Sequence, residues 1–414
     1  MFSYGAVDAN GATITSTSWT LNGAALASNN PANGVLFRPG GYTFAVTAND
    51  GSGRSAQAQK LVQVVGNPLA VSRFHACALR PDASVACWGE GTHGELGNGD
   101  VLAHSSPVTV AGLSKVVSLA LGHEHSCAVR DDGSAACWGG NRSAQLGDGT
   151  TTPSATPVAV PGLGTVQQLA AGESHTCALQ TDGQVFCWGL LPDGQMATRA
   201  LAVAGLTAIR QITAGAGFSC ALKSGGSIWC WGNNDTGQLG RGTVTPVEPA
   251  AAPVANLTGV VSVQAGYGHV CALRNDFTVT CWGAGTNGQL GIGPQAQDSP
   301  LPVQLPGITD AVALSTGLYN ACITRRSGDV ECWGRNVWGE SSDTEFARPE
   351  TPTPVPSFGK VAFVAAGEHF SCALRPDGSA WCKGDNDAGE LGNGSTVASF
   401  TAVPVVGGAA WWRP

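Results

Sequence analysis

The strongest constraint on the fold of this chain is a motif, Cys-x9-Cys, that recurs seven times. Segment 77–89, Cys-Ala-Leu-Arg-Pro-Asp-Ala-Ser-Val-Ala-Cys-Trp-Gly, aligns with six later segments, and successive copies begin 50, 50, 43, 51, 51 and 50 residues apart. The copies use all 14 cysteines, which are Cys77 and Cys87, Cys127 and Cys137, Cys177 and Cys187, Cys220 and Cys230, Cys271 and Cys281, Cys322 and Cys332, and Cys372 and Cys382. Such a repeat predicts like units that bury their apolar faces against one another.

Hairpin geometry explains the ten-residue spacing of each cysteine pair. In the second copy, segment 130–134 (Arg-Asp-Asp-Gly-Ser) is typical of a three-residue loop with Gly133 in the left-handed position. Counting outward along the antiparallel ladder places Cys127 opposite Cys137, with a Cα separation of roughly 4.5–5.5 Å. That separation is within disulfide range. We therefore predict one disulfide per copy and an oxidising compartment.

The same loop position predicts two local irregularities. Five copies carry glycine there, whereas Ala83 and Phe277 occupy it in the first and fifth copies. A residue with a Cβ atom is strained in the left-handed region, so we expect strain or a different turn at these two loops. Each bridge closes an 11-residue loop, which corresponds to roughly 2.5–3 kcal/mol of chain entropy as an upper value.

A metal site is the alternative use of these cysteines. A histidine precedes the first cysteine by two residues in four copies, at His75, His125, His175 and His269. Zinc sites need four convergent ligands at shorter cysteine spacings, so we expect disulfides and no metal. Because the histidines recur at one repeat position, we expect them to be structural rather than catalytic.

No motif for cofactor binding or catalysis stands out. Segments 89–94 and 283–288 match the spacing Gly-x-Gly-x-x-Gly, but no helix is expected after either, as a dinucleotide site requires. Walker, His-Glu-x-x-His, EF-hand and Gly-x-Ser-x-Gly motifs do not occur in the sequence. We expect no enzymatic activity, no catalytic residues and no cofactor.

The repeats resemble those of the regulator-of-chromosome-condensation (RCC1) family. That family combines Ala-Gly-x-x-His-(Ser/Thr)-x-Ala-Leu, Asp-Gly, Trp-Gly and Gly-Gln-Leu-Gly, and segment 214–240 is the best match here. The resemblance covers about 69–414 and implies a seven-bladed β-propeller with four-stranded blades. Paired cysteines in every copy resemble the secreted bacterial branch of the family.

Three copies depart from the family pattern. The third copy is seven residues short and has segment 190–196 where Gly-Gln-Leu-Gly is expected. The sixth copy has segment 337–340 at that position, and the seventh has Lys383 in place of tryptophan. The ring could be closed by segment 68–71 or by the apolar C-terminal segment 409–412, and we favour the former.

Residues 1–66 lack cysteine and predict a separate domain. Tyr42, Phe44 and Val46 alternate as in a half-buried strand, and segment 61–65 reads as a closing strand. With Trp19, this pattern resembles the polycystic-kidney-disease (PKD) type of immunoglobulin-like β-sandwich. The first strand of that family would precede Phe2. We therefore expect either a chain trimmed at its N terminus or a sandwich that takes a strand from another chain. Trimming would also explain the absent signal peptide.

Composition agrees with an all-β chain: the 414 residues include 58 Gly and 23 Pro, and 12% are charged. A formal net charge of −8 disfavours binding to nucleic acid or anionic lipid. No stretch reaches the roughly 20 apolar residues that span a bilayer. We expect a secreted, extracellular or cell-surface protein without membrane insertion.

Local function should lie where the copies differ, in the loops between the glycine turn and the first cysteine. We predict a partner-binding rim there that comprises Arg73, Phe74, His123, Glu124, Tyr267, Tyr319, Glu368 and His369, with Trp338 as an additional anchor. The leading expectation is a non-enzymatic scaffold that binds another protein. The alternatives are a structural subunit that self-assembles on a surface or in a filament, and a lectin.

Overall fold

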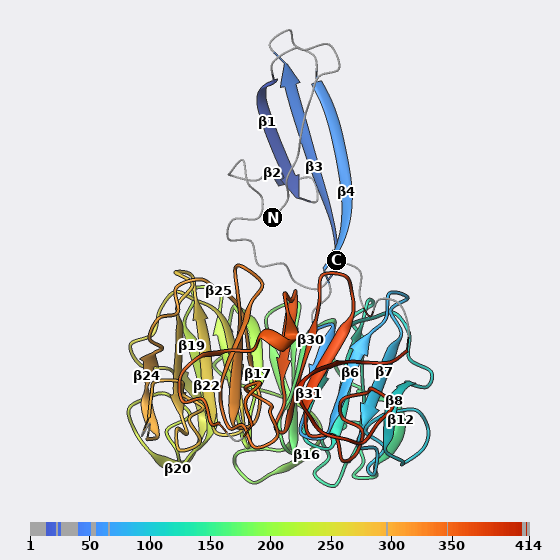
Figure 1. The fold of residues 1–414 in the computed structure, drawn as a ribbon, viewed down its shortest axis with the longest axis vertical. Coiled ribbons are helices and arrows are strands. Elements are labelled where there is room, and N and C mark those ends of the chain that lie inside the picture. The colour runs from blue at the N-terminus through green and yellow to red at the C-terminus, as the bar shows by residue number, and fades with distance from the viewer. Residues whose placement is uncertain are drawn as a thin grey trace. The chain divides into compact units, whose positions relative to one another are not determined.

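The computed structural model describes residues 14–21, 24–25, 40–50, 55–64, 67–294, 297–345, 347–407 and 411. The chain separates into two compact units, Met1–Gly66 and Asn67–Pro414. The second unit consists of seven antiparallel four-stranded sheets, each with its strands in sequence order. First strands of successive sheets contact one another, and that of the last sheet contacts that of the first, so the sheets form a closed ring. Figure 1 shows this ring from the side. The predicted seven-bladed propeller is confirmed.

Blades 1 to 4 contain sixteen strands. In chain order they are β5 (Leu69–Val71), β6 (His75–Leu79), β7 (Val85–Gly89), β8 (His104–Thr109), β9 (Val116–Leu121), β10 (His125–Arg130), β11 (Ala135–Gly139), β12 (Ser154–Ala159), β13 (Val166–Ala171), β14 (His175–Gln180), β15 (Val185–Leu190), β16 (Met196–Ala202), β17 (Ile209–Ala214), β18 (Phe218–Lys223), β19 (Ile228–Asn234) and β20 (Thr245–Pro253). Since β5 pairs with β6, segment 68–71 supplies the first strand of blade 1, as favoured from the sequence.

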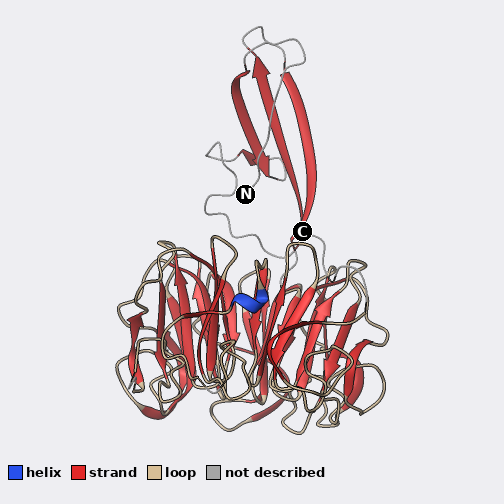
Figure 2. Ribbon diagram, in the orientation of Figure 1, coloured by secondary structure: helices blue, strands red, loops and turns tan. Residues whose placement is uncertain are grey.

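Blades 5 to 7 contain the remaining twelve strands. They are β21 (Val260–Ala265), β22 (His269–Arg274), β23 (Val279–Gly283), β24 (Ser299–Gln304), β25 (Ala311–Thr316), β26 (Asn320–Arg325), β27 (Val330–Gly334), β28 (Thr353–Pro354), β29 (Phe363–Ala366), β30 (Phe370–Leu374), β31 (Ala380–Gly384) and β32 (Ser399–Pro404). Within the described ranges, the 3-10 turn η1 (Pro356–Phe358) accompanies them, and no helix there is long and apolar enough to cross a membrane (Figure 2).

The second and third strands of every blade have the predicted register. Cys127 pairs with Cys137 directly across the ladder, and Arg130 N–H donates to the carbonyl of Ser134 at 2.9 Å. All fourteen cysteines form the seven predicted disulfides. Their Cα separations of 4.0 to 4.1 Å are shorter than we predicted, because the covalent bridge draws the two strands together.

The two loops without glycine keep the same turn, so the strain we predicted is present. The φ angles of Ala83 and Phe277 are 62° and 66°, in the left-handed region. We expect Ala83→Gly to raise the free energy of unfolding by about 1 kcal/mol, because it removes the Cβ strain. Gly183→Ala should lower it by about 1 kcal/mol, because the backbone would be strained at φ 85°. The added Cβ itself would fit, since its nearest neighbour would lie 3.5 Å away, at ordinary van der Waals contact.

Urea denaturation of both variants measures this pair of effects. Opposite shifts of the midpoint are expected at nearly constant slope. A loss of stability in Ala83→Gly would show that the loop conformation costs nothing in the native protein.

The core lies between blades, and the two sequence signatures of the repeat meet there. Trp138 of blade 2 is fully buried, and its indole Nε1 donates to the carbonyl of Glu95 in blade 1 at 2.8 Å. Gly97 packs on the same indole so closely that an added Cβ would lie 2.6 Å from Nε1. The tryptophan of the Trp-Gly signature in one blade therefore packs against the Gly-x-Leu-Gly signature of the preceding blade.

The same contact closes the ring. Trp88 Nε1 of blade 1 donates to the carbonyl of Glu390 in blade 7 at 2.8 Å, across 302 residues of sequence. Trp411, after the last strand, packs against Trp88 with ring centroids 5.7 Å apart and is 3% exposed. The apolar C-terminal segment thus contributes to closure through this side chain, while β5 supplies the strand.

The departures from the repeat pattern in copies six and seven compensate for each other. Lys383 takes the tryptophan position, and Ser341 and Ser342 of blade 6 replace the leucine and glycine that would pack on it. The fully buried Lys383 Nζ lies 2.5 Å from Asp343 Oδ1. Burial lowers the pKa of Lys383, and the Asp343 carboxylate opposes that shift. An ion pair therefore replaces the indole contact between these two blades.

The first unit contains one described sheet with strand order β2-β1-β3-β4. These strands are β1 (Ile14–Leu21), β2 (Ala24–Ala25), β3 (Gly40–Asp50) and β4 (Ser55–Val64). The strand expected around Tyr42 to Val46 is β3, and the closing strand begins at Ser55, earlier than expected. The second sheet of a sandwich and the question of its first strand lie outside the described residues.

Candidate functional site

The turns that follow the seven first strands surround one mouth of the central channel. A cavity of about 100 Å³ lies there. Each blade contributes to the cavity lining the last residue of its first strand and the turn that follows. In six blades this turn begins with glycine, whereas in blade 1 it begins with Ser72. The residues after these positions are Arg73, His123, Glu173, Ala216, Tyr267, Leu318 and Glu368, and all but Glu368 line the cavity. We call the surface formed by these turns and by the loops after the third strands the channel-mouth face.

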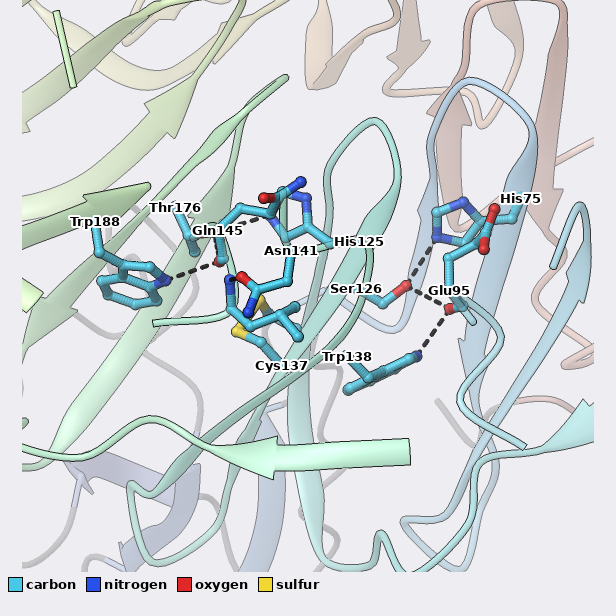
Figure 3. The surroundings of a disulfide bond; sticks show 12 residues. His75, Glu95, His125, Ser126, Cys137, Trp138, Asn141, Gln145, Thr176 and Trp188 are labelled. Carbon is cyan, nitrogen blue, oxygen red and sulfur yellow. Dashed lines mark hydrogen bonds between the residues drawn. A yellow bond between two sulfur atoms is a disulfide. The ribbon is translucent and has the colours of Figure 1, made fainter. Parts of the chain in front are cut away.

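Buried histidines pack against the turns that follow the first strands and support them. An added Cβ on Gly122 would lie 2.2 Å from His125 Cε1, so the glycine leaves room for the imidazole. His75 Nε2 lies 2.8 Å from Ser126 Oγ of the next blade, and that hydroxyl donates to the carbonyl of Glu95 at 2.9 Å (Figure 3). Since the hydroxyl proton is used there, His75 is assigned as the Nε2–H tautomer.

The interblade link recurs in the next two blades. His125 Nε2 lies 2.8 Å from Thr176 Oγ1, and His175 Nε2 lies 2.8 Å from Ser219 Oγ. Burial lowers the pKa of His75 and His125 to about 3 and that of His175 and His269 to about 4. These imidazoles are therefore neutral at pH 7. Within the described residues, no group of three or more His, Cys, Asp or Glu side chains is arranged to hold a metal ion.

A buried carboxylate supports the loop behind each of three turns. Glu95 Oε2 accepts the backbone N–H of His93 at 2.7 Å, whereas Gln145 Oε1 makes the equivalent bond in blade 2. Burial raises the pKa of Glu95, and likewise that of Glu390, to about 7. At alkaline pH these buried carboxylates are therefore ionised, although the uncharged amide of Gln145 fills the same structural role in blade 2.

We expect Glu95→Gln to stabilise the protein above neutral pH. Because the folded pKa is raised, stability is fully present below pH 4.5 and is lost as pH rises through about 7. The variant should match the parent at pH 4.5 to 5 and exceed its free energy of unfolding by about 3 kcal/mol at pH 8. Urea denaturation at the two pH values measures this difference. The exposed Glu345→Gln is the control, and an equal gain at both pH values would contradict the ionic explanation.

One sector of the channel-mouth face is closed by its own contacts. Glu368, 4% exposed, lies 2.8 Å from Arg73 Nε and 3.3 Å from Arg335 Nη1. Arg73 Nη1 also lies 2.7 Å from His123 Nε2. The Phe74 ring packs beside the His123 and His369 rings, with centroids 6.4 and 5.8 Å away. The structure thus brings these predicted rim residues together, with their polar groups already paired.

A second sector is more open. The rings of Tyr267 and Tyr319 lie 5.6 Å apart, and Tyr267 is 37% exposed. Burial, followed by the charge of the nearby Glu173 carboxylate, raises the pKa of Tyr267. Trp338 is 37% exposed in the blade 6 loop. Glu124 lies apart from both groups, with Oε2 3.9 Å from His93 Nε2.

Sequence reasoning missed Glu173 and Arg335. Glu173 occupies the same repeat position as Arg73, and Arg335 directly follows the Trp-Gly of copy six. Comparing residues position by position around the repeat would have found both.

The two dinucleotide-like segments have a packing explanation. In blade 2, buried Asn141 organises the loop, and its Nδ2 donates to the carbonyls of Thr150 and Thr152. Gly91 takes that position in blade 1, where an added Cβ would lie 2.0 Å from the carbonyl of Leu102. Gly285 is equally close to the carbonyl of Gln297. Both glycines are required by the close approach of a loop backbone.

Comparison with known families identifies the repeat. A model described as RCC1-like domain matches residues 41–345, and one described as Regulator of chromosome condensation (RCC1) repeat matches residues 361–390. The solved structure of Prp20p from Saccharomyces cerevisiae superposes with a TM-score of 0.72 at 23% identity, covering 83% of this chain and 87% of that one. Human WBSCR16 gives a TM-score of 0.71 at 20% identity, covering 78% and 94%. These likenesses show the fold.

Curated relatives are much longer proteins. The probable E3 ubiquitin-protein ligase HERC4 of Rattus norvegicus is 31% identical over 142 residues, or 33% of this chain and 13% of HERC4. The probable E3 ubiquitin-protein ligase HERC6 of Homo sapiens is 34% identical over 134 residues, or 31% and 13%. The matched region thus spans 13% of the length of each ligase.

Proposed function

Because this chain belongs to the RCC1-like domain family, we propose that it is a non-enzymatic module that binds another protein through the channel-mouth face. The observation that carries this proposal is the open sector, where Tyr267, Tyr319 and Trp338 stand partly exposed on a closed, disulfide-bonded ring. Aromatic side chains on a rigid scaffold lose little entropy on binding and dominate interface energies. A solved relative, Prp20p, is described as binding Gsp1p and histones, which supports a protein partner.

We further propose that the protein works outside the cell, like the secreted bacterial members that it resembles. Seven disulfides support this, because reducing compartments do not sustain them. In this proposal the first unit is a PKD/Ig-like sandwich that acts as a spacer, and the net charge of −8 keeps the protein from nucleic acid. Ligase activity is not part of the proposal, since the similarity covers only 13% of those enzymes.

The test compares proteins captured from the native growth medium by the full chain and by a variant. Tyr267→Ala/Tyr319→Ala/Trp338→Ala removes the open aromatic side chains. We expect a partner retained by the parent to be lost, and its affinity, measured with the purified partner, to fall at least tenfold.

The matched control removes similarly exposed apolar side chains away from the channel-mouth face. Leu201, Phe277 and Val312 are 43%, 40% and 46% exposed, and the control replaces each with serine. Equal binding by the aromatic variant and the parent would overturn the proposed binding face.

A further inference from the structure

We infer, on the basis of the proposed function, that the partner presents an apolar anchor flanked by cationic side chains. The inference rests on how side chains are segregated around the channel-mouth face. Two neighbouring blades carry the apolar and aromatic groups, and the other five carry carboxylates that are at least partly exposed.

The anchor sector lies on blades 5 and 6 and consists of Tyr267, Leu318, Tyr319, Val337 and Trp338. Three of these side chains, those of Tyr267, Val337 and Trp338, are between 37% and 41% exposed. The turn residues 267–268 and 318–319 and the first four loop residues after each third strand, 284–287 and 335–338, include no Asp or Glu. Tyrosine, tryptophan and flanking arginine are the residues enriched at energetic centres of interfaces.

Internal contacts orient the anchor sector before any partner binds. The Tyr319 ring lies 5.6 Å from the Tyr267 ring, and the backbone N–H of Tyr267 donates to the carbonyl of Leu318 at 3.1 Å, so the two blades hold Tyr267 in place. The Arg335 guanidinium lies 5.8 Å from the Tyr319 ring centroid and is ion-paired with Glu368 and Glu340. A fixed apolar surface whose one cation is already ion-paired favours an apolar side chain of the partner.

The acidic arc occupies the other five blades of the same face. Its members are Glu90, Glu124, Glu173, Asp193, Asp235 and Asp387, all at least partly exposed. Three arginines lie in the same turns and loops: Arg73 is paired with Glu368, Arg241 is paired with Glu248, and Arg142 is exposed. Because the blades form a ring, the arc reaches the anchor sector from both sides, with Asp387 on blade 7 and Asp235 on blade 4.

Charge complementarity therefore selects a basic partner surface. Carboxylates on both sides of an apolar centre attract lysine and arginine flanking an apolar anchor and repel acidic competitors. The same arc repels nucleic acid and anionic lipid, so a protein segment is the occupant that fits.

The probe is a display library of random 12-residue peptides, selected against the immobilised full-length chain. We expect enriched peptides to carry a large apolar residue with lysine or arginine on both sides. A synthetic copy should bind at least tenfold more weakly to Tyr319→Ala/Trp338→Ala, and its affinity should fall as salt rises. Thermal melting of that variant near the parent temperature confirms that the loss is not unfolding.

A matched pair of charge reversals tests the arc. Asp387→Lys changes an exposed carboxylate beside the anchor sector, and Asp131→Lys changes one in a hairpin loop at the opposite end of blade 2. We expect the first to weaken the peptide severalfold and the second to leave it unchanged.

Three outcomes would overturn the inference. The first is enrichment of peptides with acidic or neutral flanks, the second is an equal effect of the two charge reversals, and the third is the absence of any enriched sequence. None of these outcomes would contradict the proposal that this face binds a protein. Enriched peptides that bind normally to Tyr319→Ala/Trp338→Ala would instead count against the proposed function itself.

Discussion

Reducing all seven disulfides is expected to unfold the propeller at room temperature. Each bridge closes an 11-residue loop, so the seven together stabilise the folded chain by at most roughly 18–21 kcal/mol. The net stability of folded domains is only about 5–15 kcal/mol. After complete reduction in denaturant and transfer to buffer with phosphine reductant, far-UV circular dichroism should show no cooperative melting transition.

The folded protein should nevertheless resist reductant. Thirteen of the cysteines are 0% exposed and Cys187 is 3% exposed, and thiol exchange requires access to the sulfur atoms. Thiols counted by intact mass after alkylation should appear at the rate of unfolding, independent of reductant concentration once it is high. The control is the same chain carried through denaturant without reductant. A reduced chain that melts within a few degrees of the oxidised one would refute this role for the bridges.

Trp411→Ala is expected to lower the free energy of unfolding of the propeller by about 3–4 kcal/mol. The indole is almost completely buried against Trp88, and the Arg80 guanidinium lies 5.7 Å from its ring centroid. Its backbone N–H donates to the carbonyl of Gly378 at 2.7 Å. Trp411 thus joins the hairpin of blade 7 to blade 1, where the ring closes without a shared strand.

Trp338→Ala is the matched control, because it removes the same side chain from an exposed position. We expect it to cost less than about 1 kcal/mol. Trp411→Phe should retain most of the stability, since an aromatic ring still fills the site. Denaturant midpoints for the three variants measure the order, and equal losses at 338 and 411 would show that Trp411 does not contribute to closure.

Local sequence determined the hairpin and its bridge. A ten-residue cysteine spacing around a three-residue loop allows one cross-strand register, and Cys127 does face Cys137. The strain at Ala83 and Phe277 followed from the same loop, because the left-handed position is set by turn geometry alone. Repeat number and strand order likewise predicted the blade count, since each copy brings the same short-range ladder.

The ring and its face depended on contacts between residues far apart in the chain. Nothing in the repeat itself indicates that Gly-x-Leu-Gly of one copy receives the tryptophan of the next, or that Glu390 and Trp88, 302 residues apart, complete the circle. The rim residues were recognised as variable positions, but burial of Glu368 beneath two arginines depends on which turns meet.

The cysteine repeat by itself determined the blade, its bridge and the number of blades. These features come from backbone pairing within about ten residues, which sequence spacing specifies directly. Only the tertiary structure decided which side chains are left for a partner, because that depends on closing the ring. Closure pairs Arg73 with Glu368 across the junction of blades 1 and 7, and leaves Tyr267, Tyr319 and Trp338 partly exposed on blades 5 and 6.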